Sequence, residues 1–180
     1  MKIYVCGACN SGKAEIVRRI SEKLKIKAII DPSETVFQPV FGMGLGRVFR
    51  GRRWEGKQPE TYQGIMEYLD VLDSDGPFVS NEGPILFLSH LMFFGVLSTF
   101  TDLQRQQIVE RSLAMTCRGF HVIIERWVPA NTFDEVSVLI QKNIAGARDN
   151  VIVLKKYKDY GETIEKASRK IVREVKQKWQ

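Results

Sequence analysis

Cysteine is scarce in this chain of 180 residues. Three cysteines are too few for a scaffold held by disulfides, and their odd number leaves at least one unpaired. Cys6 and Cys9 form a C-x-x-C pair, but no second pair of cysteine or histidine ligands accompanies them. A metal or redox role therefore has little support, and we interpret both as small residues where bulk is not tolerated. The two histidines, His90 and His121, belong to no metal-spaced cluster, and we expect them to be structural.

The chain also lacks a long uninterrupted apolar run. The longest candidate, 84–100, is interrupted by Ser89, His90 and Ser98, whereas a membrane-spanning helix needs about 20 predominantly apolar residues. We expect a buried helix there and no membrane span. A strand pattern begins at Lys2, so we also expect no signal peptide and a cytoplasmic protein.

What the sequence does contain is the pattern of a phosphate-binding loop. Residues 7–13 read GACNSGK, which fits G-x-x-x-x-G-K, between the apolar run 3–6 and a segment of helical periodicity. Glycines let backbone N–H groups close around phosphate oxygens, and the helix N-terminus adds a favourable dipole. The residues predicted to bind a nucleotide are Gly7, Ala8, Cys9, Asn10, Ser11, Gly12, Lys13 and Ala14. The alternative is a glycine-rich turn that only joins a strand to a helix.

Two residues of this pattern bear directly on chemistry. Lys13 would reach the outer phosphates as a point charge, so we assign it a catalytic role. Ala14, in contrast, stands where a Ser or Thr hydroxyl would ligate magnesium. Because Mg²⁺ keeps several waters and takes further oxygens from substrate phosphates, the loss of one hydroxyl need not abolish metal binding, and Ser11 lies close by. Ala14 weakens the case for fast catalysis more than the case for nucleotide binding.

Apolar runs and helical patterns alternate along the whole chain, which favours a parallel sheet with right-handed crossovers. Strands are expected at 2–6, 27–30, 77–80, 120–124 and 151–154. Helices are expected from the loop to about 24, at 59–72, from 84 onward, and at 102–116, 133–145 and 161–179. This order predicts an α/β, three-layer P-loop NTPase fold with a five-stranded parallel sheet. We expect one domain over residues 1–180.

The net charge of +6 is unevenly distributed. Residues 47–57 contain five basic residues and one acidic residue, a local charge of +4, so anionic ligands are the natural partners. The guanidinium fork suits phosphate because it donates two parallel bonds. The residues predicted to bind the substrate are Asp31, Arg47, Arg50, Arg52 and Arg53. We expect a turn over 31–34 and a flexible closing loop over 41–57; the alternative is a mobile basic loop with no defined ligand.

The N-terminal loop motif, the length and the order of elements resemble the P-loop kinases of nucleosides and nucleotides. The closest resemblance is to the compact phage and bacterial nucleotide-kinase-like ATPases, which include nicotinamide-riboside-kinase-like domains. It spans nearly the whole chain, but only Gly7–Lys13 is a specific motif. The resemblance implies ATP and Mg²⁺ as cofactors, with a degenerate magnesium-binding position, and a nucleotide and a small-molecule acceptor as partners.

In that family the third strand ends with an acidic residue that helps to hold magnesium or accepts the proton of the substrate hydroxyl. Here Asn81 occupies the expected position, and Glu82 follows one residue later. Glu82 would supply the carboxylate, as catalytic group and metal ligand, through a shifted turn that Gly83 permits. Equally, Glu82 would be a solvated residue favoured by the dipole of the next helix. Asp31, at the end of the second strand, is the rival carboxylate.

Such kinases also carry arginines in a lid between the fourth and fifth strands. The corresponding stretch, 125–150, holds only Arg126 and Arg148, so this signature is weak. We assign Arg126 a catalytic role because it closely follows the fourth strand. The alternative is a surface ion pair with Glu125 or Glu135.

Three functions remain open at this stage. The leading hypothesis is an ATP-dependent phosphotransferase acting on a nucleoside or a (deoxy)nucleoside monophosphate, in which loop amides, Lys13, magnesium and arginines position and neutralise the phosphates. The second keeps the fold and phosphorylates modified bases in DNA, which suits the basic window 47–57. The third is a catalytically impaired nucleotide-binding protein with a regulatory role, as Ala14 and Asn81 would suggest. The oligomeric state is not predicted.

Overall fold

A five-stranded parallel sheet forms the centre of the molecule. The computed structural model describes residues 1–8, 11–125, 132–146, 148–154 and 160–178. The strands are β1 (Lys2–Gly7), β2 (Lys27–Ile29), β3 (Phe78–Ser80), β4 (Phe120–Ile124) and β5 (Val151–Leu154). They pair in the order β2-β3-β1-β4-β5, and every described pairing is parallel. The loops after β1, β2 and β3 therefore leave the sheet at the same edge.

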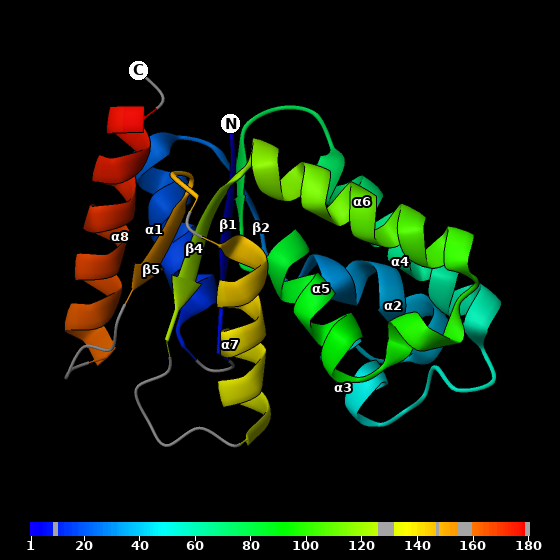
Figure 1. The fold of residues 1–180 in the computed structure, drawn as a ribbon. Helices are drawn as coiled ribbons and strands as arrows, with labels where there is room; N and C mark the ends of the chain where they lie inside the picture. Colours follow the sequence, from blue (N-terminus) through cyan, green and yellow to red (C-terminus); the bar gives the residue numbers. More distant parts are fainter. Residues whose placement is uncertain (9–10, 126–131, 147, 155–159, 179–180) are drawn as a thin grey trace.

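Helices cover both faces of this sheet (Figure 1). They are α1 (Lys13–Leu24), α2 (Pro32–Phe41), α3 (Leu45–Arg50), α4 (Gln58–Asp73), α5 (Pro84–Phe93), α6 (Asp102–Arg118), α7 (Thr132–Ala145) and α8 (Tyr160–Lys178), with a short 3₁₀ turn, η1 (Val96–Thr99). Helices α1 and α8 pack on one face, and α4, α5, α6 and α7 lie on the other. The three-layer arrangement predicted from the alternating pattern is confirmed.

The alternation of side chains along β1 explains how both layers are held. Ile3 and Val5 are fully buried against α1 and α8, whereas Tyr4 and Cys6 point into the opposite core. Tyr4 also donates its hydroxyl to the carbonyl of Leu72 at the end of α4, at 3.0 Å. Because both faces of β1 are covered, residues 3–6 are all apolar and fully buried, as in buried parallel strands. The sheet is thus a rigid base for the loops at its carboxyl edge.

Residues 31–50 differ from the expectation of a turn followed by a flexible loop. Helix α2 begins at Pro32, directly after Asp31, and α3 forms within the glycine-rich segment. Phe37 in α2 and Phe49 in α3 are fully buried and lie edge to face, 6.1 Å apart between ring centroids. Apolar anchoring thus orders a segment whose glycines had suggested flexibility. Among the described residues, no helix is long and apolar enough to cross a membrane.

Candidate functional site

The phosphate loop closes the carboxyl end of β1. Helix α1 begins at Lys13 after Gly12, whose φ of 76° lies in the left-handed region that glycine adopts without strain. The Ser11 hydroxyl donates to the carbonyl of Ala8 at 2.8 Å, and Lys13 Nζ donates to the same carbonyl at 2.6 Å. Lys13 is therefore folded back over the loop, where a phosphate would compete for its ammonium group. Two residues predicted to bind the nucleotide, Cys9 and Asn10, lie outside the described residues.

Gly7 shows why the loop needs glycine. Its φ is 122°, and a Cβ built there would meet the carbonyl oxygen of Ile124, on the adjacent strand β4, at 2.1 Å. The neighbouring amide of Ala8 donates to that oxygen at 3.2 Å. The loop backbone therefore starts in close contact with β4, and no side chain fits between them.

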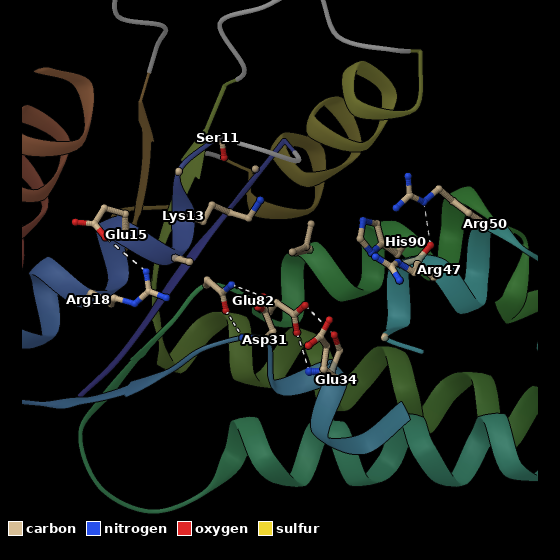
Figure 2. A pocket seen from close by; sticks show the side chains of 18 residues that line it. Ser11, Lys13, Glu15, Arg18, Asp31, Glu34, Arg47, Arg50, Glu82 and His90 are labelled. Atoms are coloured by element: carbon tan, nitrogen blue, oxygen red, sulfur yellow. Dashed lines mark hydrogen bonds and ion pairs between the residues drawn. The ribbon is translucent and has the colours of Figure 1, made fainter. Parts of the chain in front are cut away.

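A cleft of about 880 Å³ opens beside this loop. The described residues that line it come from the loop and α1, from the end of β2 and α2, from α3, and from the end of β3 and α5. They include Gly7, Ser11, Gly12, Lys13, Ala14, Glu15, Arg18, Asp31, Ser33, Glu34, Arg47, Arg50, Asn81, Glu82 and His90. Figure 2 shows Asp31, Glu34 and Glu82 grouped on one side of the cleft, with Lys13 at one end. Most residues predicted from the sequence are thus brought to one cavity.

The two candidate carboxylates, Asp31 and Glu82, have different surroundings. Both oxygens of Glu82 accept bonds from Ser33, whose N–H donates at 2.9 Å and whose hydroxyl donates at 2.8 Å. Asp31 is paired instead with Asn81: its N–H donates to Asn81 Oδ1 at 2.7 Å, and Asn81 Nδ2 donates to Asp31 Oδ1 at 2.6 Å. The ends of β2 and β3 and the segments that follow them are therefore joined by four hydrogen bonds that involve side chains, two for each carboxylate-bearing residue, and by the backbone bond from Asn81 N–H to the Ile29 carbonyl at 3.4 Å.

The protonation of Glu82 follows from its burial. Desolvation raises the pKa of Glu82 to about 7, against the two bonds from Ser33, which lower it. The nearby Asp31 raises this pKa further, and Lys13 lowers it. The Glu82 carboxyl is consequently poised between its charged and neutral forms near neutral pH.

The opposite end of the cleft is basic. Arg47 and Arg50 come from consecutive turns of α3, and His90 comes from α5 (Figure 2). Both arginines are exposed, and Arg50 Nε donates to the carbonyl of Gly46 at 3.1 Å. On the α1 side, Arg18 lines the cavity with Glu15, its ion-pair partner at 3.5 Å. An anionic group at the α3 end of the cleft would therefore find the guanidinium donors of Arg47 and Arg50.

Four other predicted residues are not placed in this cleft. One is Ala8, which is 2% exposed and packs in the core beside Ile85 and Ile123. Arg52 and Arg53 line a separate cavity of about 430 Å³, together with Phe41 and Lys57, and Arg52 forms an ion pair with Glu55. The arginine-rich window is thus divided because α3 ends at Arg50 and the chain turns away. Arg126 lies outside the described residues. Its role and those of Arg52 and Arg53 remain predictions.

Sequence reasoning missed several residues of the cleft. Ser33 holds Glu82, and Glu34, Arg18 and His90 line the wall. Asn81, which the sequence placed at the expected aspartate position, pairs with Asp31. A signal for Ser33 was present: Asp-Pro-Ser-Glu places a cap residue, a proline and an acidic residue in the positions that begin a helix, and apolar residues then follow at helical spacing. The pairing of Asp31 with Asn81 had no local signal.

The described residues of the cleft fit the phosphates of a nucleotide better than they fit its magnesium ion. The glycine backbone of the loop and Lys13 suit a polyphosphate. No group of three or more Asp, Glu, His or Cys that would hold a metal occurs within the part of the chain that the structure describes. Magnesium would therefore take most of its oxygens from phosphate and water, as it commonly does. Burial raises the pKa of Cys6 to about 12, which disfavours the reactive thiolate that a C-x-x-C redox site needs.

Comparison with known proteins gives the fold. Neither a protein-family model nor a curated protein matches the chain. Among solved structures, the chain is similar to the shikimate kinase from Aquifex aeolicus vf5, with a TM-score of 0.51 and 17% sequence identity over 98% of each chain. The likeness covers both chains almost completely, so the predicted three-layer P-loop fold is confirmed. At this identity the comparison shows the fold alone.

Proposed function

We propose that this chain is an ATP-dependent phosphotransferase that acts on a nucleoside monophosphate or a nucleoside. One observation carries the proposal: the phosphate loop opens into the same cleft as an acidic cluster and, at the other end, two arginines. Phosphoryl transfer needs a donor and an acceptor held end to end, with their negative charge neutralised. The solved structure that is similar to this chain is a kinase, which supports the reaction class. The similarity does not identify the acceptor of this chain.

Each end of the cleft has its own task. Loop amides and Lys13 would hold the phosphates of ATP, and bound Mg²⁺ would neutralise their charge. Arg47 and Arg50 would bind an anionic group on the acceptor through paired N–H bonds, which favours a monophosphate over a neutral nucleoside.

Of the two carboxylates, we propose Asp31 as the group that accepts the proton of the acceptor hydroxyl. Its Oδ1 accepts from Asn81, and among the described residues no hydrogen bond engages its Oδ2. Glu82, the carboxylate that the sequence favoured as catalytic group and metal ligand, has both oxygens bound by Ser33. Glu82 acts instead on the shape and charge of the cleft wall in this proposal.

A phosphotransfer screen tests the proposal. Labelled ATP and Mg²⁺ would be offered with nucleosides, nucleoside monophosphates and DNA, beside Lys13→Ala and the matched surface variant Lys27→Ala. Transfer to a monophosphate that Lys13→Ala loses and Lys27→Ala retains would support it, because Lys27 is exposed on β2. ATP binding without transfer to any acceptor would contradict it and favour a regulatory nucleotide-binding protein.

A DNA-directed kinase is the second candidate, and the cavity beside Arg52, Arg53 and Lys57 favours it. These cations lie outside the cleft, where they would contact a strand that extends beyond the reacting base. Such binding would weaken steeply with salt because phosphate contacts release counterions. A steep salt dependence that Arg52→Gln and Arg53→Gln reduce would support this candidate over a monomeric acceptor.

A further inference from the structure

The ends of β2 and β3 are joined beneath the cleft by the reciprocal hydrogen bonds between Asp31 and Asn81, at 2.7 and 2.6 Å. The two residues are 50 positions apart in sequence. Asn81 is 5% exposed, whereas Asp31 is half-buried at the cleft, so both bonds are partly shielded from water. Figure 2 shows the side chains of Asp31 and Glu82 on the side of the cleft nearest Lys13.

Asn81 constrains both the backbone and the side chain of Asp31. Asp31 has a φ of 48° and a ψ of 54°, the left-handed conformation that residues other than glycine adopt at a cost. Asn81 Oδ1 accepts the N–H of this strained residue, and Asn81 Nδ2 donates to its carboxylate. An amide side chain can do both because it carries one acceptor and two donor hydrogens.

We infer that Asn81 is a positioning residue, which holds the Asp31 carboxylate toward the part of the cleft where the phosphoryl group would be transferred. This inference rests on the proposed function. The family resemblance would instead make Asn81 a catalytic aspartate that this chain has lost. The two interpretations predict opposite effects of Asn81→Asp on kcat: a decrease if Asn81 positions Asp31, and an increase if Asn81 stands in place of a lost catalytic aspartate. A carboxylate at position 81 would lose the donor to Asp31 and set two negative groups against each other.

The first experiment exchanges the two groups. Melting temperature and the steady-state kinetics of the acceptor found in the screen would be measured for Asn81→Asp, Asn81→Ala and the double variant Asp31→Asn/Asn81→Asp. We expect both single variants to lower kcat by about a hundredfold while KM for ATP changes little, because a small displacement of a reacting group is costly. The double variant keeps an amide facing a carboxylate, so its melting temperature should recover while kcat does not.

The second experiment asks whether Asn81 acts through Asp31. In an Asp31→Ala background, Asn81→Ala should cause no further loss of kcat, since coupled residues are not additive. Asn150→Ala is the matched control: Asn150 Nδ2 donates to the carbonyls of Thr116 and Gly119 at 2.8 and 2.6 Å, at the other edge of the sheet. This control should lower the melting temperature and leave kcat unchanged.

The outcomes separate the two levels of the proposal. Faster transfer by Asn81→Asp than by the wild type, or additive losses in the Asp31→Ala background, would overturn the positioning role alone. An active wild type beside unaffected Asn81 variants would do the same. Absence of transfer from the wild type to every acceptor would overturn the proposed function and this inference with it.

Discussion

Single residues at the carboxyl edge of the sheet decide whether the cleft exists and how it is charged. Gly7 leaves room for the loop to pass β4, and Glu82 places a half-buried carboxyl against the first turn of α2. Each of these depends on a property that one substitution removes: the missing side chain in one case and the titratable proton in the other. Each therefore gives a prediction that does not depend on knowing the acceptor.

Gly7→Ala should both destabilise the protein and abolish ATP binding. The new Cβ would lie 2.1 Å from the carbonyl oxygen of Ile124, at a φ of 122°, so β1 or β4 must move. We expect a loss of about 3 kcal/mol or more in the free energy of unfolding, measured by urea denaturation. Gly146→Ala is the matched control, because its φ of 59° is milder and, its chain neighbours aside, no atom of the described residues lies within 4 Å of the new Cβ. Equal effects of the two substitutions would contradict this account.

Glu82→Gln should change how stability depends on pH. The pKa of Glu82 is about 7 in the folded state against 4.5 ordinarily, so between these values the folded state holds a proton that the unfolded chain has lost. The stabilisation is complete below pH 4.5 and is lost as the pH rises through 7, a change on the order of 3 kcal/mol. Glu82→Gln should lack this component, whereas the surface variant Glu22→Gln should keep it.

Denaturation curves over this range would measure the difference between variant and wild type. His121 must be accounted for, because burial lowers its pKa to about 3 and stability is lost as the pH falls from 6.5 toward that value. Its contribution is common to all three proteins and cancels in the comparison. A Glu82→Gln curve parallel to that of the wild type would show that the carboxyl is not held as described.

At the scale of elements, α2 and α3 build the side of the cleft where we propose that the acceptor binds. Helix α2 presents Ser33 and Glu34 at its first turn, and α3 presents Arg47 and Arg50. The buried Phe37 and Phe49 fix the two helices against α4 and α5. The end of α3 at Arg50 then separates the arginines that face the cleft from those that do not.

Glutamine substitutions would test this separation. Arg47→Gln with Arg50→Gln should raise the acceptor KM about tenfold or more, because charge-assisted hydrogen bonds to an anion are lost. KM for ATP should change little, since both arginines lie at the other end of the cleft from Lys13. Arg52→Gln with Arg53→Gln is the matched pair and should leave a small acceptor unaffected. A reversal of the two results would place the acceptor at the second cavity.

At the scale of the whole molecule, the parallel sheet connects nucleotide binding to global stability. The phosphate loop joins β1, the central strand, to α1, and α1 packs on α8, which lies far along the chain. Arg19 and Lys23 of α1 also form ion pairs with Glu165 of α8. A ligand at the loop would therefore contact α1, which is itself held by packing and ion pairs against the C-terminal helix α8.

ATP should consequently raise the melting temperature of the entire domain in one transition. At about 100 times its Kd, a ligand that binds only the folded state adds roughly 2.7 kcal/mol, which corresponds to about 5–10 °C for a chain of this size. Differential scanning calorimetry would measure the shift. Lys13→Ala should reduce it strongly, and Lys27→Ala should not. No shift at saturating ATP would contradict nucleotide binding itself.

Local signals in the sequence were enough for the sheet and the loop. The alternating burial of Ile3, Tyr4, Val5 and Cys6 follows from the two-residue period of a strand, and glycine at positions 7 and 12 follows from the left-handed or crowded backbone there. The strand period and the left-handed turn depend on residues adjacent in the chain, whereas the crowding at Gly7 comes from Ile124 of β4. The helix that begins at Pro32 was also encoded locally, in its cap, proline and acidic residue, although glycines further on suggested a loop instead.

By itself, then, the sequence determined a parallel α/β fold with a phosphate loop, because periodicity and turn chemistry act over a few neighbouring residues. Only the tertiary structure decided which charged groups share the cleft. Asp31 and Asn81 meet across 50 residues because β2 and β3 are neighbours in the sheet, and Arg47 is separated from Arg52 because α3 stops between them. Strand order and helix length are products of packing, which no single segment of the chain contains.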